Sequence, residues 1–321
     1  MEKAITATEP SRADLARIEL VGRARDYAAA SKADNTRRAY RSDWAGFSSW
    51  CVAQRLEALP AAPETVALYL TARAEAGRKA STITRCLAAI SEAHLAVGLA
   101  SPRGSSAVKA VLAGIRRTTG TDPSQKAALL PGELKAMLAV LPRTTSGRRD
   151  RALLLVGFCG AFRRSELVGL NAEDVARVDD GLKITLRRSK TDQEGEGRKV
   201  GLPFGSSPST CPVRALAAWM DESLISSGAI FRRVNRHGHM GDRLTGRAVA
   251  LVVKRAARLA GIDDSRLAGH SLRAGLATAA ANAGKSERSI MKQTGHRSER
   301  MVAKYIRDAS LFTENAAAGL L

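Results

Sequence analysis

The sequence predicts a mainly helical protein of two domains, a bundle of helices followed by a mixed α+β domain with one small β-hairpin. Three observations lead to this fold class. Apolar residues recur at helical spacing through most of the 321-residue chain, one polar stretch with breaking residues interrupts them between 118 and 131, and one short stretch after it alternates like a strand. A chain of this length is also expected to form more than one core.

Residues 1–120 are expected to form the first domain, because helical patterns fill residues 11–119 and no strand pattern interrupts them. Asn35 and Thr36 are good capping residues for one helix. Four residues follow on one face of that helix, at spacings of 4, 3 and 4: Tyr40, Trp44, Phe47 and Cys51. We expect this aromatic stripe to pack in a core, with base stacking as the alternative. Further helices are predicted at 63–76, 81–97 and 105–117, which makes a bundle of four or five.

Residues 121–130 are expected to link the domains, because Gly120, Asp122 and Pro123 interrupt the helical pattern there. The second domain, 131–321, begins with helices. Residues 182–188 then alternate and contain β-branched residues, 189–197 are typical of a turn, and 198–203 provide a return strand. Helices are predicted again at 213–227, 245–260, 271–283, 286–294 and 298–306.

The charge favours a polyanionic partner, since 51 basic against 31 acidic residues give a net charge of +20. Nucleic acid is the usual partner of such a chain, and a membrane surface is the runner-up. The first ten residues lack the apolar region of a secretory signal, and the longest conspicuous apolar run, 152–162, is 11 residues long. We therefore expect a cytoplasmic, nucleoid-associated protein without a membrane span.

No metal or cofactor is predicted from the residue types. The four cysteines show no zinc-binding spacing, so they are interpreted as reduced thiols. Gly284, Lys285 and Ser286 look like the end of a phosphate-binding loop, but Ala279 stands where that loop needs glycine.

Six residues of the second domain form a set with shared chemistry, although each alone would be an ordinary surface or packing residue. In chain order they are Arg163, Lys190, His270, Arg273, His296 and Tyr305. Arginine and histidine can hydrogen-bond the non-bridging oxygens of a phosphodiester transition state. Tyr305 offers an oxygen nucleophile, His270 is a plausible acceptor for its proton, and Lys190, in the predicted hairpin turn, can protonate the leaving oxygen.

In this order the set resembles that of the tyrosine recombinase (phage integrase) family, and the resemblance covers essentially the whole chain. GAFRRSEL resembles the box of the family's first arginine, which maps Arg163 to that arginine and Glu166 to its supporting acidic residue. A simple i,i+3 ion pair is the alternative for Glu166. The gaps of 26 and 9 residues that separate His270, His296 and Tyr305 are similar to those of Cre recombinase, although Cre has Trp at the position of His296.

The resemblance implies a SAM-like helical core-binding domain before a catalytic domain with a small sheet. It also implies a site-specific recombinase that cleaves one strand of a double-stranded DNA recombination site through a 3′-phosphotyrosine, for integration, excision or resolution, with no cofactor. Family members act as tetramers on DNA, and the tail at 311–321 would dock in trans on a neighbouring protomer. Hairpin lysines shift position within the family, so Lys183 and Lys199 remain alternatives to Lys190.

Basic residues outside the catalytic set are candidates for DNA contacts. Four are expected along one face of the predicted 245–260 helix, with a solvated face as the alternative: Arg243, Arg247, Lys254 and Arg258. Five more lie near helix starts of the first domain: Arg37, Arg38, Arg41, Lys79 and Arg85. Two other functions remain open at this point, a type IB topoisomerase or hairpin-end resolvase with the same chemistry, and a basic DNA-binding protein without catalysis.

Overall fold

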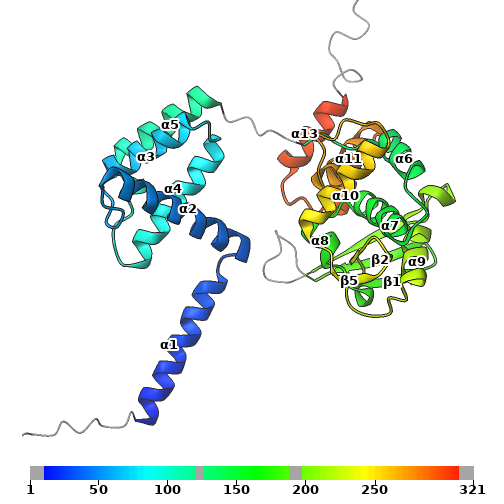
Figure 1. Ribbon diagram of the computed structural model, residues 1–321, viewed down its shortest axis with the longest axis horizontal. Helices are drawn as coiled ribbons and strands as arrows, with labels where there is room; N and C mark the ends of the chain where they lie inside the picture. Colours follow the sequence, from blue (N-terminus) through cyan, green and yellow to red (C-terminus); the bar gives the residue numbers. More distant parts are fainter. Residues whose placement is uncertain (1–10, 121–125, 188–196, 311–321) are drawn as a thin grey trace, which may run out of the picture. The chain divides into compact units, whose positions relative to one another are not determined.

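The computed structural model describes residues 11–120, 126–187 and 197–310, and the chain divides into two compact units, Met1–Ser124 and Gln125–Leu321 (Figure 1). Within the described ranges, no helix has both the length and the apolar composition that a bilayer span requires.

The first unit is helical throughout its described part. Its main helices are α1 (Arg12–Ala30), α2 (Asp34–Gln54), α3 (Pro63–Glu75), α4 (Ala80–Ala96) and α5 (Ser106–Thr119). Helices α2 and α4 pack together, as do α3 and α5, around one apolar core. Phe47 and Cys51 lie in that core, and Trp44 packs against it, so core packing explains most of the predicted aromatic stripe.

The second unit is built around the buried helix α7 (Thr145–Cys159), in which every residue from Ala152 to Phe158 is buried. Because this stretch of α7 is apolar on all sides, other elements must cover it on all sides. Its neighbours include α8 (Arg164–Gly169), α9 (Pro212–Ser223), α10 (Gly246–Leu259) and α11 (His270–Asn282). Helix α6 (Pro131–Ala139) opens the unit, and α12 (Glu287–Thr294) and α13 (Glu299–Ser310) follow α11.

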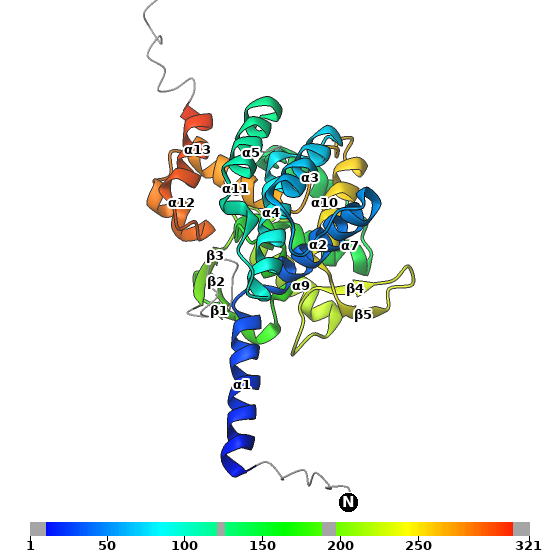
Figure 2. The same cartoon turned by 90° about the vertical axis from the view of Figure 1, so that its left-hand side faces the viewer.

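A three-stranded antiparallel sheet has the order β1-β2-β3, with β1 (Val175–Val178), β2 (Gly181–Leu186) and β3 (Arg198–Pro203) (Figure 2). The predicted hairpin is the β2–β3 pair, in register at Ile184 opposite Val200. Strand alternation places Val200 and Leu202 on the buried face. Arg198 is on this same face, whereas Lys199 points to the opposite one.

Residues 126–130 belong physically to the second unit, although the sequence placed them in the linker. The N–H of Ala127 donates to the carbonyl of Arg266 at 2.9 Å, and that of Leu129 to Ser271 at 3.0 Å. Gly275 of α11 makes the close approach possible, because a Cβ there would lie 2.0 Å from the carbonyl oxygen of Leu129. The first half of the expected linker, 121–125, lies outside the described residues.

The predicted fold class, mainly helical with one small sheet, is confirmed. Two features were not predicted. Strand β1 extends the hairpin, and a second hairpin joins β4 (Arg232–Val234) to β5 (Met240–Arg243). Both additions are short, and a run of three or four residues gives little alternation to detect in a sequence.

Candidate active site

The first arginine of the site stands at the start of α8. Glu166, the third residue of that helix, accepts the backbone N–H of Arg163 at 2.9 Å and its Nη1 at 2.6 Å. The first contact caps the helix and the second fixes the guanidinium. Only 1% of the Glu166 side chain is exposed. Glu166 is therefore both the cap of α8 and a buried counter-ion of Arg163.

Arg273, on the first turn of α11, is the most deeply buried cation of the site, with 1% of the residue exposed. Its Nη1 donates to the carbonyl of Ala161 at 2.8 Å and also to that of Thr294. Its Nη2 is buried and has no partner within the part of the chain that is described. Burial and then the charge of Arg163 lower the pKa of Arg273 to about 10, against the opposing effect of Glu166.

Arg198 is a third arginine of the site, which the sequence analysis did not identify. Its Nη2 lies 3.7 Å from Glu166 Oε2, and its Nη1 donates to the carbonyl of Gln293 at 3.0 Å. Burial, followed by the charge of Arg163, lowers the pKa of Arg198, while Glu166 raises it. The signal that could have revealed Arg198 was its position two residues before Val200, on the core face of the return strand.

His296 follows α12 and is 8% exposed. Its Nδ1 lies 2.9 Å from Thr294 Oγ1. The pKa of His296 is lowered to about 4, first by burial and then by the positive charges of Arg273 and Arg163, with smaller effects of His270 and Arg198. The ring is therefore neutral at pH 7.

His270 is the first residue of α11, one turn before Arg273. The residue is accessible to solvent, but its ring is still partly desolvated by the surrounding protein atoms. That desolvation, and then the charges of Arg273, Arg164 and Arg163, lower the pKa of His270. An accessible and neutral imidazole suits proton transfer with a bound substrate.

Tyr305 lies on α13, partly buried against a small apolar cluster formed by Ala277, Ile290 and Val302. Its ring is stacked on that of His296, with centroids 6.2 Å apart and planes inclined by 26°. The cluster joins α11, α12 and α13, so it positions Tyr305 relative to the residues of the other two helices. Tyr305 is also close enough to Arg273 to influence the pKa of that arginine.

The electrostatic balance of the site is positive. Arg163 and Arg198 contact the buried carboxylate of Glu166, and the charge of Arg273 also interacts with it. The pKa values of His270 and His296 are both lowered, so the imidazoles add little positive charge at pH 7. A buried donor without a protein acceptor costs free energy unless a ligand supplies the acceptor. Arg273 Nη2 is a donor of this kind. Together with the excess positive charge of the site, it suits the binding of a multiply charged oxyanion such as a phosphoryl group.

The predicted acid Lys190 falls in 188–196, which lie outside the described residues. The two alternatives, Lys183 and Lys199, are described and are exposed on β2 and β3. Thr185 pairs with Lys199, so both lysines lie on the outer face of the hairpin. Arg198, which contacts Glu166, lies on the other face.

Six of the nine predicted DNA-contact residues have protein partners among the described residues, and four of them are bound by groups outside their own helix or strand. Arg243 lies on β5 and not on the α10 helix, and its Nη1 donates to the carbonyl of Val168 at 2.7 Å. Lys254 and Arg258 lie 3.8 and 3.5 Å from Asp264. Arg85 makes a bidentate pair with the buried Asp43, at 2.7 and 3.0 Å. These contacts brace the fold and offset part of each positive charge.

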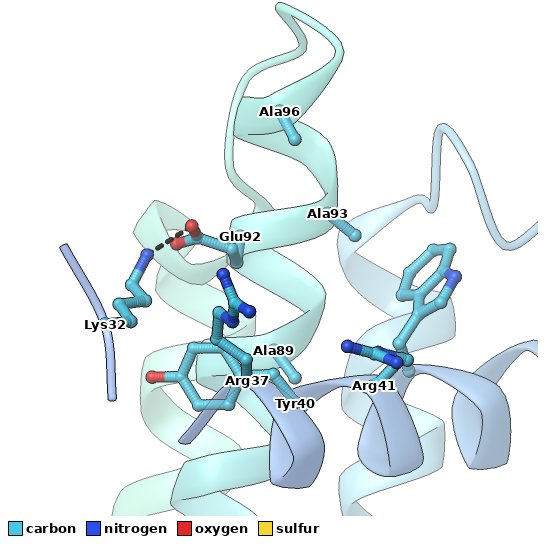
Figure 3. Close-up of a pocket in the computed structure, with 9 residues that line it drawn as sticks. Lys32, Arg37, Tyr40, Arg41, Ala89, Glu92, Ala93 and Ala96 are labelled. Carbon is cyan, nitrogen blue, oxygen red and sulfur yellow. Dashed lines mark hydrogen bonds and ion pairs between the residues drawn. The ribbon is translucent and has the colours of Figure 1, made fainter. Parts of the chain in front are cut away.

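The remaining predicted contact residues are exposed: Arg37, Arg38, Arg41, Lys79 and Arg247. Figure 3 shows Arg37 and Arg41 on α2, beside Tyr40 and across from Ala89 and Ala93 of α4. Together they line an open hollow of about 490 Å³. Lys32 and Glu92 form an ion pair at its edge.

The described residues contain no group of three or more His, Cys, Asp or Glu side chains that could hold a metal ion. All four cysteines are free thiols, and Cys51, Cys86 and Cys211 are buried. His237 and His239 occupy the turn of the second hairpin, where Asn235 Oδ1 accepts the backbone N–H of both.

Residues 128–311 match the model of the phage integrase family, which covers more than half of the chain and includes every predicted catalytic residue. The chain belongs to the phage integrase family. It is 41% identical to an integrase/recombinase XerD homolog of Selenomonas ruminantium over 291 residues, which are 89% of this chain and 85% of that protein. It is also 26% identical to the tyrosine recombinase XerD of Yersinia pestis, over 82% and 83% of the two chains.

Solved structures of this family share the fold. A crystal structure of a lambda integrase dimer bound to a core site aligns with a TM-score of 0.60 at 18% identity, over 92% of this chain and 94% of that chain. A XerH site-specific recombinase bound to a palindromic difH substrate aligns with a TM-score of 0.59 at 18% identity, over 81% and 72%. This phage integrase is therefore a tyrosine-type site-specific recombinase.

Proposed function

We propose that this recombinase cleaves one strand of duplex DNA by attack of Tyr305 on a phosphodiester, leaving a 3′-phosphotyrosine and a free 5′-hydroxyl. The observation that carries this proposal is the buried Arg273 Nη2, which lacks a partner among the described residues and belongs to a site with excess positive charge. The electrostatic interactions of Arg163, His270, His296 and Tyr305 with Arg273 support the proposal.

The cleavage step is a phosphoryl transfer. The phenol oxygen of Tyr305 loses its proton to an imidazole and forms a bond to phosphorus, while the bond from phosphorus to the 5′-oxygen breaks and that oxygen takes a proton from an acid. Attack by the 5′-hydroxyl of a partner strand reverses the step and joins the new strand. The phosphotyrosine ester keeps the energy of the broken bond, so no nucleotide cofactor is required.

Arg163 and Arg273 are assigned to the non-bridging phosphate oxygens, and Glu166 to holding Arg163 in position. Charge-assisted donors placed before the reaction stabilise developing charge, and one such donor contributes about 3 to 4 kcal/mol to a transition state. The buried contacts of both guanidiniums support this role, since neither side chain needs to reorganise when the phosphate binds.

Lys190 is proposed as the acid that protonates the leaving 5′-oxygen. The pleat of the hairpin supports Lys190 over the alternatives, because Lys183 and Lys199 point to the face opposite Arg198. Lys190 itself lies outside the described residues.

Duplex DNA carrying a recombination site is the proposed substrate, with residues 1–120 as a core-binding domain and 131–321 as the catalytic domain. The net charge of +20 and the exposed Arg41, Lys79 and Arg247 support this partner. Arg37 and Arg38 are included, although each also contacts a polar neighbour, Asp34 and Asn35 respectively. Arg243, Arg85, Lys254 and Arg258 retain at most a secondary role, since protein groups already bind them.

Four protomers on two DNA sites are the proposed assembly, with the tail at 311–321 docking on a neighbouring protomer. The tail itself lies outside the described residues. An apolar hollow of about 480 Å³ lined by Pro203, Phe204, Leu276 and Ile290 supports the idea, because it offers an apolar tail a place to bind. Sedimentation of DNA complexes formed by the full chain and by a chain ending at 310 would test it, and equal tetramer formation would contradict the docking.

The central test is trapping of the covalent intermediate. A nicked DNA substrate containing the recombination site releases a short 5′-hydroxyl strand after cleavage, so the adduct accumulates and survives denaturation. We expect an adduct with the wild-type chain and with Tyr27→Phe, an exposed control on α1, and none with Tyr305→Phe. An adduct formed equally by Tyr305→Phe would refute the proposal. The linking number of closed circular products separates recombination from simple relaxation.

A further inference from the structure

Thr294, the last residue of α12, has a completely buried hydroxyl next to His296. Its Oγ1 lies 2.7 Å from the carbonyl oxygen of Ile290, 3.5 Å from that of Met291, and 2.9 Å from His296 Nδ1. The hydroxyl thus has three close neighbours but only one hydrogen to donate.

The position of that hydrogen decides the protonation of the histidine. A carbonyl oxygen can only accept, so the 2.7 Å contact with Ile290 requires the hydroxyl hydrogen to point at that carbonyl. If the hydrogen pointed at His296 instead, two oxygen lone pairs would face each other at 2.7 Å in a buried site. The contact between Thr294 Oγ1 and His296 Nδ1 must therefore use a hydrogen carried by Nδ1.

A neutral imidazole with its hydrogen on Nδ1 has a bare lone pair on Nε2. Nε2 lies on the side of the ring away from Thr294. The charged and titratable groups that act on the ring are Arg273 and His270 of α11, Arg163 before α8, and Arg198 of β3, with Tyr305 of α13 stacked on it. Burial, and then the charges of Arg273, Arg163, His270 and Arg198, lower the pKa of His296, so the ring is neutral when the reaction begins. With the hydrogen on Nδ1, this neutral ring offers Nε2 as a hydrogen-bond acceptor.

We propose that Thr294 is a positioning residue that fixes His296 as the Nδ1–H tautomer, so that His296 Nε2 takes the phenol proton when Tyr305 attacks phosphorus. The inference rests on the proposed cleavage by Tyr305. The bond between hydrogen and the Tyr305 oxygen breaks, a bond between hydrogen and His296 Nε2 forms, and the new imidazolium carries the positive charge. When a 5′-hydroxyl attacks the phosphotyrosine, the proton returns to the departing phenolate.

This assignment changes what His296 contributes at each stage. Before the attack, Nε2 cannot donate a hydrogen bond to a phosphate oxygen. After it accepts the proton, Nε2–H faces the pentacoordinate phosphorus as a charged donor, while Nδ1–H remains bound to Thr294. The bound phosphate opposes the field of Arg163 and Arg273, which makes protonation of the ring easier at the moment it is needed. His270 is the competing acceptor.

The chain contains an internal standard for the tautomer. His94 of the first unit is buried, its Nδ1 lies 2.8 Å from the carbonyl of Ile90, and its Nε2 accepts the backbone N–H of Ala61 at 2.9 Å. Both contacts require the hydrogen on Nδ1. The ¹⁵N signals of His94 therefore give the reference pattern for an Nδ1–H imidazole in the same sample.

The first experiment is ¹⁵N NMR of the full chain labelled at histidine, with His94 and His296 assigned by His94→Gln and His296→Gln. We expect wild-type His296 to show the pattern of His94 at pH 7. Thr294→Ser should preserve it, and Thr294→Val, which has the same shape without the hydroxyl, should lose it. An Nε2–H pattern for wild-type His296 would overturn the proposal, and this result needs no variant of Thr294 to fold.

The second experiment measures single-turnover cleavage of the nicked substrate. Loss of the Thr294 hydroxyl should slow adduct formation roughly tenfold, the usual value of one hydrogen bond, with DNA affinity unchanged and Thr294→Ser close to wild type. A substrate with sulfur at the bridging 5′ position, whose thiolate leaves without an acid, should rescue Lys190→Ala but not Thr294→Val or His296→Gln. Rescue of Thr294→Val, or unchanged cleavage after its tautomer has changed, would show that His296 is not the acceptor.

The two experiments also separate this inference from the proposed function. If the wild-type chain formed no adduct through Tyr305, the proposed cleavage would be refuted. The NMR pattern would still report the tautomer of His296. An adduct from Tyr305 together with an Nε2–H His296 would keep the proposed function and overturn only the role of Thr294.

Discussion

Replacement of Glu166 with Gln should destabilise the second unit by about 3 kcal/mol. The carboxylate accepts from the Arg163 backbone at 2.9 Å and from Arg163 Nη1 at 2.6 Å, and Arg198 Nη2 lies 3.7 Å away. Removing one partner of a buried ion pair costs about 3 to 5 kcal/mol. The lower end applies here, because the Arg163 and Arg198 side chains are 18% and 21% exposed and water can solvate part of the unpaired charge.

Glu133→Gln provides the matched control. Glu133 is also the third residue of a helix, α6, and its Oε2 accepts the backbone N–H of Leu130 at 2.8 Å. No ion pair of Glu133 is found in the described part of the chain. Glutamine can still accept that hydrogen bond, so we expect a loss below about 1 kcal/mol. The difference between the two variants measures the contribution of the Glu166 charge.

Urea unfolding can be followed through Trp219, which is fully buried in the second unit and donates from Nε1 to the carbonyl of Ile230 at 2.9 Å. Trp44 and Trp50 of the first unit are changed to Phe in every variant, so fluorescence reports only the second unit. Equal losses for Glu166→Gln and Glu133→Gln would refute the view that Glu166 acts as a counter-ion and would leave only its capping role.

Three other predictions follow from the site. Gly295→Ala should cost more stability than Gly284→Ala. The two glycines have φ of +68° and +67°, but only a Cβ at Gly295 would meet a neighbour, Arg198 at 2.9 Å. Equal losses of stability in urea unfolding would contradict this contact. Protonation of His296 should destabilise the fold, because its pKa falls from 6.5 to about 4 on folding. The free energy of unfolding should therefore rise with pH between these values, by about 3 kcal/mol in total. His296→Gln should flatten this pH dependence in unfolding experiments from pH 4 to 7. Arg273→Lys should reduce adduct formation by about 100-fold or more with little change in DNA affinity. The lysine ammonium lacks the planar fork that lets Arg273 donate to the carbonyls of Ala161 and Thr294 and to a phosphate at the same time. Near-normal cleavage would show that Arg273 does not bind the phosphate.

Periodicity predicted the long helices well, because each depends on local spacing. The predicted 245–260 and 286–294 helices correspond to α10 and α12 within one residue at their starts and ends, with Thr245 and Ser286 accepting the capping hydrogen bonds. The hairpin was found for the same reason. The short strands β4 and β5 were missed, and as a result Arg243 was assigned to a helix face when it lies on a strand and binds the carbonyl of Val168.

The sequence by itself determined the chemistry that is available. Arginines, histidines and a tyrosine in a fixed order, with a basic composition, were sufficient to indicate the family, because residue type and spacing are written directly in the chain. Only the tertiary structure decided how these groups act on one another. Arg198 reaches Glu166 across 32 positions of sequence, and the buried hydroxyl of Thr294 sets the proton on His296. Contacts of this kind depend on burial and on the direction of single hydrogen bonds, which no local pattern records.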